Sequence, residues 1–478
     1  MKKAIFWKLL ERFGVQGIQF ILQIILARML DPEHYGVLSI MIIFTSLANV
    51  FIQTGFSTAL IQNKDVTEED YSSVFWITLG IAAAMYGIIF MGAPLIGRFY
   101  EMPDIVLPLR VLAIMLFPGA LNSVQHAKVC REMDFKKVFY SNVFGIVIAG
   151  AAGVAAAMMG AGLWALILQN MLNVIVACMV MFLTVAWRPR LVCNLRRVAD
   201  LFRFGWKLLM SGLLNTFYQE LSGLVVGAKY NASTLAYYNR GRQFPQFLIT
   251  AVDGTVQSVM LPAMSAEQDD KLKVKEMMRT SMSMSAYILF PMMAGLAAVA
   301  EPLVSLLLTD KWLPCVPYMQ VYCFTLAFYP VHSCNLQAVN AMGRSDLFLK
   351  LEIIKKSYGI VVLAIAVFCF ESPLAIAATG LITTWIGWFV NAFPNKKLIG
   401  YSYKEQILDL FPILFMALGM CVMVLLVGKW VEMADIPQII TMIVEIIIGV
   451  TVYLMLSAVV KPHPFVILIE QLKRTLKK

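Results

Sequence analysis

Long apolar runs dominate the pattern of hydrophobic and polar positions along this chain. From near the N-terminus to Val460, apolar stretches of about 20 residues alternate with short polar segments, and each is long enough to cross the ~30 Å core of a bilayer as a helix. Only helices and closed barrels satisfy their backbone polar groups in lipid. The pattern predicts an all-α polytopic membrane protein with about fourteen transmembrane helices. The expected spans lie near residues 12–29, 36–61, 73–97, 107–127, 138–159, 162–186, 206–228, 243–264, 280–308, 316–342, 356–371, 373–393, 409–429 and 437–460.

One stretch of the chain occurs twice. Residues 107–150 return in diverged form as residues 316–364, and each copy reads as an apolar helix, a short basic loop and a second apolar helix. A shift of 212 residues superposes Pro118 on Pro330, Gln125 on Gln337 and Asp134 on Asp346. Two related halves are typical of transporters that rock one half against the other.

The repeat predicts a domain organisation. We expect a six-helix lobe over residues 1–187, a cytoplasmic amphipathic linker over 188–206 and a second six-helix lobe over 207–394. Helices 13 and 14, with a basic cytoplasmic tail, occupy residues 395–478. Because each half has an even number of spans, the two lobes are expected to be pseudo-symmetric about an axis along the membrane normal.

Composition and charge agree with this class. The chain is 60% hydrophobic and 14% charged, with a mean hydropathy of +0.76, which excludes a soluble globular protein. With both termini cytoplasmic, about 31 of the 39 Lys and Arg residues fall on the cytoplasmic side. The net charge of +10 then reflects topology and contact with membrane lipids, and no nucleic-acid partner is expected. The eight cysteines are scattered, so we expect no disulfide framework, metal site or cofactor.

Several spans carry polar residues on one helical face. The first span carries four of them at spacings of three or four residues: Arg12, Gln16, Gln19 and Gln23. Such a face serves either as a hydrogen-bonded seam between helices or as part of a polar substrate passage. The second span adds Asn49 and Gln53, and the repeated stretch adds Gln125 in one copy and Gln337 with Asn340 in the other.

Ionisable residues inside spans are costly and are candidates for function. Glu220 lies in the middle of the seventh span and is either an ion-coupling acid or the partner of a base such as Lys207 or Arg240. Asp253 in the eighth span is a second acid, either a partner for an arginine or a proton or sodium site. Arg240 and Arg242 stand at the outer end of the eighth span, against the usual charge bias, and suit the oxygens of a phosphate-bearing substrate.

The chain shows no signature of an enzyme. It contains neither the phosphate-binding GxxxxGK[ST] nor the nucleophile motif GxSxG. A membrane polymerase or ligase acting on lipid-linked glycans would need a sizeable outer loop, whereas the outer loops expected here have about 5 to 15 residues. We therefore expect a transporter rather than an enzyme.

Five segments resemble a known family. They are LARMLDPEHYG (26–36), GFSTALIQ (55–62), REMDFKK (131–137), YYNRGRQFPQ (237–246) and VMLPAMS (259–265). Together they resemble the polysaccharide transporters of the Wzx-type oligosaccharide flippase family, within the superfamily that also holds the MATE drug exporters and the lipid II flippases.

The resemblance implies a substrate and a mechanism. Undecaprenyl-pyrophosphate-linked oligosaccharide would be flipped across the bacterial inner membrane by alternating access, for the synthesis of capsule, exopolysaccharide or O-antigen. A polysaccharide polymerase and glycosyltransferases would be its partners. The alternative is an ion-coupled multidrug or metabolite exporter of the MATE type, whose pocket would favour acids and aromatics over the cations found here.

Overall fold

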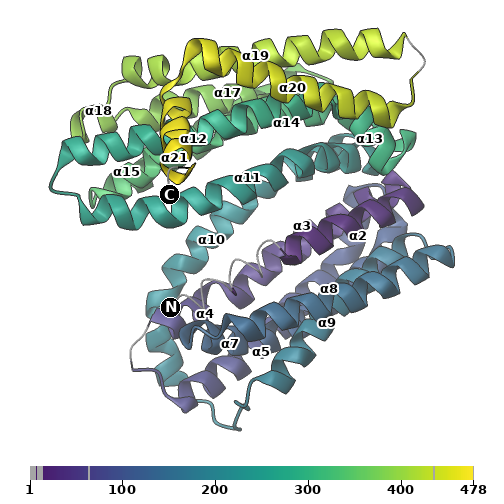
Figure 1. Cartoon of the computed structure of the whole chain (residues 1–478). Helices are drawn as coiled ribbons and strands as arrows, with labels where there is room; N and C mark the ends of the chain where they lie inside the picture. The colour runs from purple at the N-terminus through teal and green to yellow at the C-terminus, as the bar shows by residue number, and fades with distance from the viewer. Residues whose placement is uncertain (1–6, 8–13, 63–64, 434–435, 477–478) are drawn as a thin grey trace. The chain divides into compact units, whose positions relative to one another are not determined.

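The computed structural model describes residue 7 and residues 14–62, 65–433 and 436–476, and every regular element in these residues is a helix. The chain divides into unit 1, Met1–Ala236, and unit 2, Tyr237–Lys478. Within each unit, long helices run alongside one another (Figure 1). The all-α class predicted from the sequence is confirmed.

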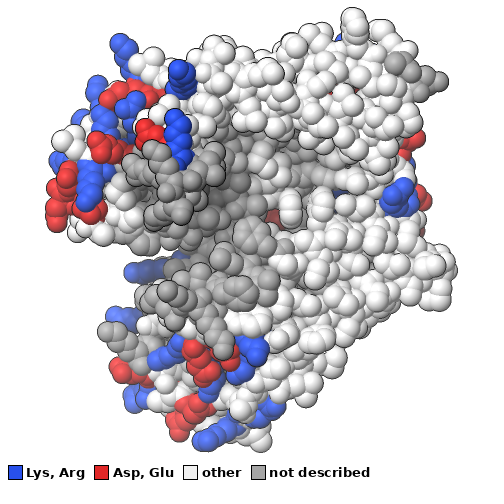
Figure 2. Space-filling view, viewed as in Figure 1, with Lys and Arg blue, Asp and Glu red and all other residues white. Residues whose placement is uncertain are grey.

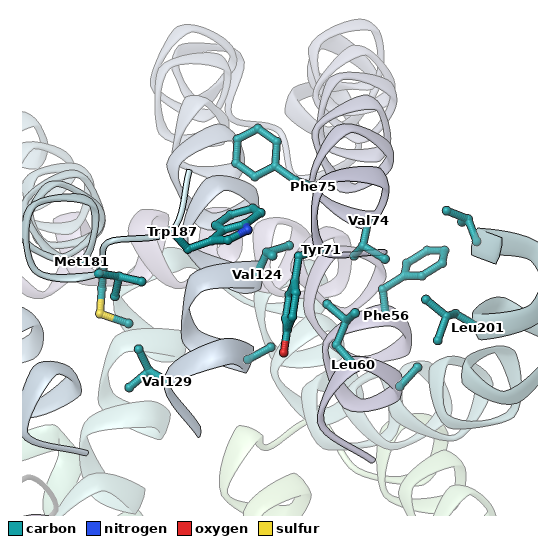
Figure 3. Close-up of a cluster of buried hydrophobic side chains, with 14 of the residues drawn as sticks. Phe56, Leu60, Tyr71, Val74, Phe75, Val124, Val129, Met181, Trp187 and Leu201 are labelled. Carbon is teal, nitrogen blue, oxygen red and sulfur yellow. The ribbon is translucent and has the colours of Figure 1, made fainter. Parts of the chain in front are cut away.

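Unit 1 contains the helices α2 (Gln16–Met29), α3 (Pro32–Gln53), α4 (Gly55–Gln62), α5 (Glu68–Phe99), η2 (Pro103–Ile105), α6 (Val106–Leu112), η3 (Ala113–Met115), α7 (Leu116–Arg131), α8 (Phe135–Met158), α9 (Leu163–Thr184), α10 (Leu195–Lys229) and the start of α11 (Ala232–Ala266). A cluster of buried apolar side chains joins one end of several of these helices (Figure 3). In it, Phe75 of α5 meets Trp187 edge-on at 6.1 Å, and Phe56 of α4 stacks on Phe202 of α10 at 5.6 Å. Trp187 thereby packs the segment between α9 and α10 against α5.

Unit 2 contains the rest of α11, followed by α12 (Lys271–Ala298), α13 (Ala300–Leu308), η4 (Asp310–Cys315), α14 (Val316–Ala327), α15 (Tyr329–Ala341), α16 (Ser345–Cys369), α17 (Pro373–Ala392), α18 (Asn395–Leu398), α19 (Tyr403–Glu432), α20 (Gln438–Val460) and α21 (His463–Leu476). Helix α19 packs extensively against both α12 and α20. The C-terminal helices are therefore an integral part of this unit.

The two repeated stretches have the same local structure. Each begins after a 3₁₀ turn, continues as a helix that is interrupted before its second half, and ends at a three-residue loop before the next helix. Each loop contains one residue with positive φ, Met133 (56°) in the first copy and Gly343 (71°) in the second. Just after Gly343, Arg344 donates two hydrogen bonds to the carboxylate of Asp346, and these hold the pKa of Asp346 below its usual range. The predicted helix–loop–helix form is present in both copies.

Nine of the described helices are long and apolar enough to cross a membrane. They coincide with nine of the fourteen expected spans. The other five expected spans correspond to α2, α10, α11, the pair α14 and α15, and α16, which are short, interrupted or rich in polar residues. On the face shown in Figure 2, most charged side chains gather toward the left and right sides of the view, and most of the described surface between them is uncharged. The protein is thus a multi-pass membrane protein.

Helix α10 joins two segments that we expected to be separate. It runs without interruption from Leu195 to Lys229, so most of the expected linker is the first part of the helix that carries the seventh span. The side chain of Asn194 caps it by accepting a hydrogen bond from the backbone N–H of Arg197.

The beginnings of α10 and α19 share a sequence and a mode of attachment. Asp200-Leu201-Phe202 recurs, 209 residues later, as Asp409-Leu410-Phe411. Arg197 of α10 pairs with Asp70, the acid of the capping box that starts α5. In unit 2, Lys275 of α12 pairs with Glu405, the acid of the capping box that starts α19. The two junctions are alike, with acid and base exchanged between the helices.

Candidate functional site

In unit 1, two polar side chains of α3 bond to each other where α7 lies close. Gln53 donates a hydrogen bond from Nε2 to Oδ1 of Asn49, at 3.1 Å. A Cβ atom at Gly119 of α7 would lie 3.7 Å from the same Asn49 oxygen, so the glycine brings the two helices close at this point. Asn122 lies one turn further along α7 and is half-buried. The structure therefore joins Asn49 and Gln53 by a hydrogen bond and places α7, with Asn122 one turn beyond Gly119, beside α3.

Gln125 is the most deeply buried of the expected site residues. It is 0% exposed, and among the described residues neither its Oε1 nor its Nε2 has a hydrogen-bond partner. A buried polar atom left without a partner costs about 1–3 kcal/mol. Gln125 thus retains two unused hydrogen-bonding atoms in the interior of unit 1.

The glutamines of α2 differ in their exposure. Gln19 is exposed, whereas Gln16 and Gln23 are half-buried. Leu22, on the neighbouring part of the helix surface, packs against Gly150 of α8. Arg12 lies outside the described residues. The two alternatives for this face, a hydrogen-bonded seam and a polar passage, both remain predictions.

Glu220 is half-buried on α10 in unit 1. Lys207 lies thirteen residues earlier on the same uninterrupted helix, which separates the two residues by about 20 Å at 1.5 Å per residue. Lys207 is also exposed. The expectation that Lys207 could neutralise Glu220 is therefore wrong, because continuous helical geometry keeps the two apart.

In unit 2, Arg240 is held inside the protein. Its guanidinium carbon lies 4.7 Å from the ring centroid of Trp312, and Nη1 donates a 2.6 Å hydrogen bond to Oε1 of Gln243. The residue is 6% exposed. Since α11 begins at Ala232, Arg240 and Arg242 lie eight and ten residues into this helix, and their place at the outer end of the membrane span stays a prediction. Arg242 is half-buried and has the more accessible surface of the two.

The remaining expected residues are less closely defined. Gln337 and Asn340 are both half-buried on α15 and lie three residues apart, which places them on one face. Asp253 belongs to α11, but its side chain lies outside the described residues.

A fully buried hydrogen-bond network, which the sequence analysis missed, connects α15, α17, α18 and α19. Asn395 donates to Oδ1 of Asn335 at 2.8 Å, and Gln406 donates to the same oxygen at 3.2 Å. Trp388 donates to Oε1 of Gln406 at 2.9 Å. Asn335, Asn395 and Gln406 are 0% exposed. These residues come from segments up to 71 positions apart, so no local pattern could have grouped them.

Unit 2 also contains an apolar groove with a volume of about 430 Å³. Its wall comprises residues of α11, α12, α13, α19 and α20, including Leu248, Pro291, Gly295, Val299, Leu303, Met420, Val424, Glu445, Gly449 and Tyr453. Glu445 is the one acid among the lining residues and is 6% exposed. Gly428 of α19 leaves the space that its carboxylate occupies.

The chemistry of these groups is that of binding. Among the described residues, no three His, Cys, Asp or Glu side chains come together in a group able to hold a metal ion. The side-chain amides can donate and accept hydrogen bonds, an arginine side chain with accessible surface can donate them, and the groove can cover hydrocarbon. Unit 1 thus offers polar groups, and unit 2 offers both polar groups and an apolar groove.

Comparison with known proteins gives a consistent result. A family model described as "Polysaccharide biosynthesis protein" matches residues 25–317, more than half of the chain. The lipopolysaccharide biosynthesis protein WzxC of Escherichia coli K12 is 23% identical over 414 residues, covering 85% of this chain and 83% of WzxC. The succinoglycan biosynthesis transport protein ExoT of Rhizobium meliloti is 26% identical, covering 64% and 62%. The teichuronic acid biosynthesis protein TuaB of Bacillus subtilis is 24% identical, covering 71% of each chain.

The fold is similar to two solved structures. The lipid II flippase MurJ in an inward closed conformation matches with a TM-score of 0.76 and 15% identity, over 95% of this chain and 98% of MurJ. An inward-facing multidrug resistance MATE family transporter of the MOP superfamily matches with a TM-score of 0.63 and 15% identity, over 82% and 99%.

Proposed function

Because this chain belongs to the polysaccharide biosynthesis protein family, we propose that it transports a lipid-linked oligosaccharide across the membrane. The substrate is undecaprenyl-pyrophosphate-linked oligosaccharide, which moves from the cytoplasmic to the outer leaflet of the bacterial inner membrane. The product serves the synthesis of an export polysaccharide. Glycosyltransferases act before the transport step, and a polymerase acts after it.

One observation supports the proposal above the others: this membrane protein has polar side chains in unit 1 and an apolar groove in unit 2. Asn49 and Gln53 present hydrogen-bonding groups in unit 1, and the groove in unit 2 is walled by hydrocarbon. A polar molecule alone would not need the groove, and a lipid alone would not need the amides. A sugar and pyrophosphate joined to a polyprenyl chain needs both, because the sugar cannot enter hydrocarbon without hydrogen-bond partners.

The transport cycle is alternating access between two lobes of six helices each, with fourteen spans and both termini in the cytoplasm. Gln16, Gln19, Gln23, Asn49, Gln53, Gln125, Gln337 and Asn340 contribute to the polar path. Arg242 attracts the pyrophosphate, and Arg240, two residues earlier, adds a second positive charge near it. Glu220 and Asp253 couple transport to an ion gradient.

Substitution of Arg242 tests this assignment. We expect Arg242→Ala to lower the rate at which the lipid-linked oligosaccharide reaches the outer leaflet by roughly tenfold, the effect of losing one hydrogen bond to a charged group. The matched control is Arg98→Ala, which removes an exposed arginine from the end of α5. Equal rates for the two variants, at equal protein levels, would remove Arg242 from the path.

A further inference from the structure

The last helix, α21, has an orientation unlike that of the helix before it. Helix α20 ends at Val460, Lys461 follows in the left-handed conformation (φ 49°), and Pro462 leads into α21. Figure 1 shows α21 running across the direction of α19 and α20. Since α20 is apolar enough to span the bilayer, a helix that turns across it at its end lies along the membrane surface.

The sequence of α21 separates apolar from polar positions. Apolar residues recur at the spacing of one helical face, namely at Phe465, Leu468, Ile469, Leu472 and Leu476. Helix α21 contacts α12, yet Leu468 remains 40% exposed and Val466 39% exposed. The protein therefore leaves part of the apolar side of α21 uncovered.

The segment 461–478, which includes α21, has a strongly positive net charge. Its basic residues are Lys461, Lys473, Arg474, Lys477 and Lys478, and its one acid is Glu470. Lys461 and Lys473 are both exposed. Lys477 and Lys478 lie outside the described residues. In the sequence, an apolar stripe on a helix together with several bases is the combination that inserts between acyl chains while its cations meet anionic headgroups.

We propose that α21 is a binding surface for anionic phospholipids in the leaflet at which α20 ends. The apolar stripe takes up the acyl-chain boundary and the basic residues bind the phosphate groups. Helix α21 follows α20 directly and contacts α12, and both α20 and α12 line the apolar groove. Lipid bound to α21 therefore holds the adjoining ends of α12 and α20 at the membrane surface. The proposal does not depend on which substrate is transported.

The test compares two lipids on the purified full-length protein. Native mass spectrometry measures the binding of phosphatidylglycerol and of phosphatidylcholine to the wild type, to a variant with Lys473→Gln, Arg474→Gln, Lys477→Gln and Lys478→Gln, and to a control. The control carries Lys271→Gln, Lys396→Gln, Lys397→Gln and Lys404→Gln, which removes four exposed lysines of the same unit. The two variants have the same net charge.

The wild type and the control are expected to prefer phosphatidylglycerol several-fold, and the preference should weaken with added salt. The α21 variant should lose most of this preference, and Leu468→Asp should weaken the binding of both lipids. A wild type without a preference, or an α21 variant that keeps the preference of the control, would overturn the proposal.

Discussion

Lys275 and Glu405 join the first turns of α12 and α19 through an ion pair of 2.6 Å. The side chain of Glu405 also accepts the backbone N–H of Ser402 in a capping box, so one carboxylate both begins α19 and attaches it to α12. In unit 1, Asp70 has the same two roles, but it stands on α5 and receives its cation from α10. One form of junction thus serves both units with opposite polarity.

Reversing the charge of Lys275 should weaken this junction. Lys275→Glu places two carboxylates together and should lower the free energy of unfolding by about 1 kcal/mol, the scale of a partly exposed ion pair. Adding Glu405→Gln removes the repulsion, and because glutamine also serves in a capping box, the double variant should recover part of the loss. Thermal denaturation of the purified variants measures both effects. Lys271→Glu, on the same turn of α12, is the control, and a double variant less stable than Lys275→Glu would contradict the assignment.

Gly36 allows the first turn of α3 to touch the first turn of α11. A Cβ atom there would collide with the backbone carbonyl of Ala232, which cannot move aside as a side chain can. We expect Gly36→Ala to reduce the yield of folded protein several-fold, as overpacking costs about 1–3 kcal/mol or more. Gly87→Ala meets nothing within 4 Å and should be neutral or slightly stabilising. Detergent extraction followed by size-exclusion chromatography compares the two, and equal yields would show that the contact is unimportant.

Asn335 is the centre of the buried network in unit 2. Removing its side chain in Asn335→Ala takes away the acceptor used by both Gln406 and Asn395 and leaves buried donors with fewer partners. The free energy of unfolding should fall by about 2 kcal/mol. Asn340→Ala, on the same helix but half-buried, should cost clearly less. If chemical denaturation gives the same midpoint for both variants, the network does not stabilise the protein.

The apolar groove can be filled without introducing a charge. Gly295 lies in its wall, where a Cβ atom would make only ordinary contact with Met420 at 3.7 Å, and Gly295→Phe should occupy part of the 430 Å³. If the groove holds the hydrocarbon chain of the substrate, transport should fall strongly at equal protein level. Gly80→Phe adds the same side chain at an exposed position of α5 with nothing within 4 Å. Normal transport in Gly295→Phe would remove the groove from the path.

The sequence predicted the parts of this structure that depend on local pattern. Helical spans and the two helix–loop–helix copies follow from the run of apolar residues and from turn residues such as Gly343. Nine of the fourteen expected spans coincide with candidate spans among the described residues, and both copies were found. Family membership followed from short segments such as LARMLDPEHYG. These features depend on neighbours in the chain, which a sequence displays directly.

The sequence did not predict contacts between distant segments. Nothing in the sequence indicated that the Arg240 guanidinium packs over the ring of Trp312, which lies 72 residues away in the chain. The expected pair of Glu220 with Lys207 failed because α10 does not break between them. Gln406 gave no signal of its own, since its role depends on Asn335, Asn395 and Trp388 in other helices. Side-chain partners of this kind are set by packing, which the order of residues does not reveal.

The most direct test of the proposed function is a flipping assay with the purified protein in liposomes. A fluorescent undecaprenyl-pyrophosphate-linked oligosaccharide is placed in both leaflets, and the fraction accessible to an added enzyme that cleaves the glycan is followed over time. The proposal predicts that this fraction rises beyond the outer-leaflet share in liposomes with the wild type, and much more slowly with Arg242→Ala. A wild type that leaves the inner-leaflet substrate protected, as in protein-free liposomes, would contradict it.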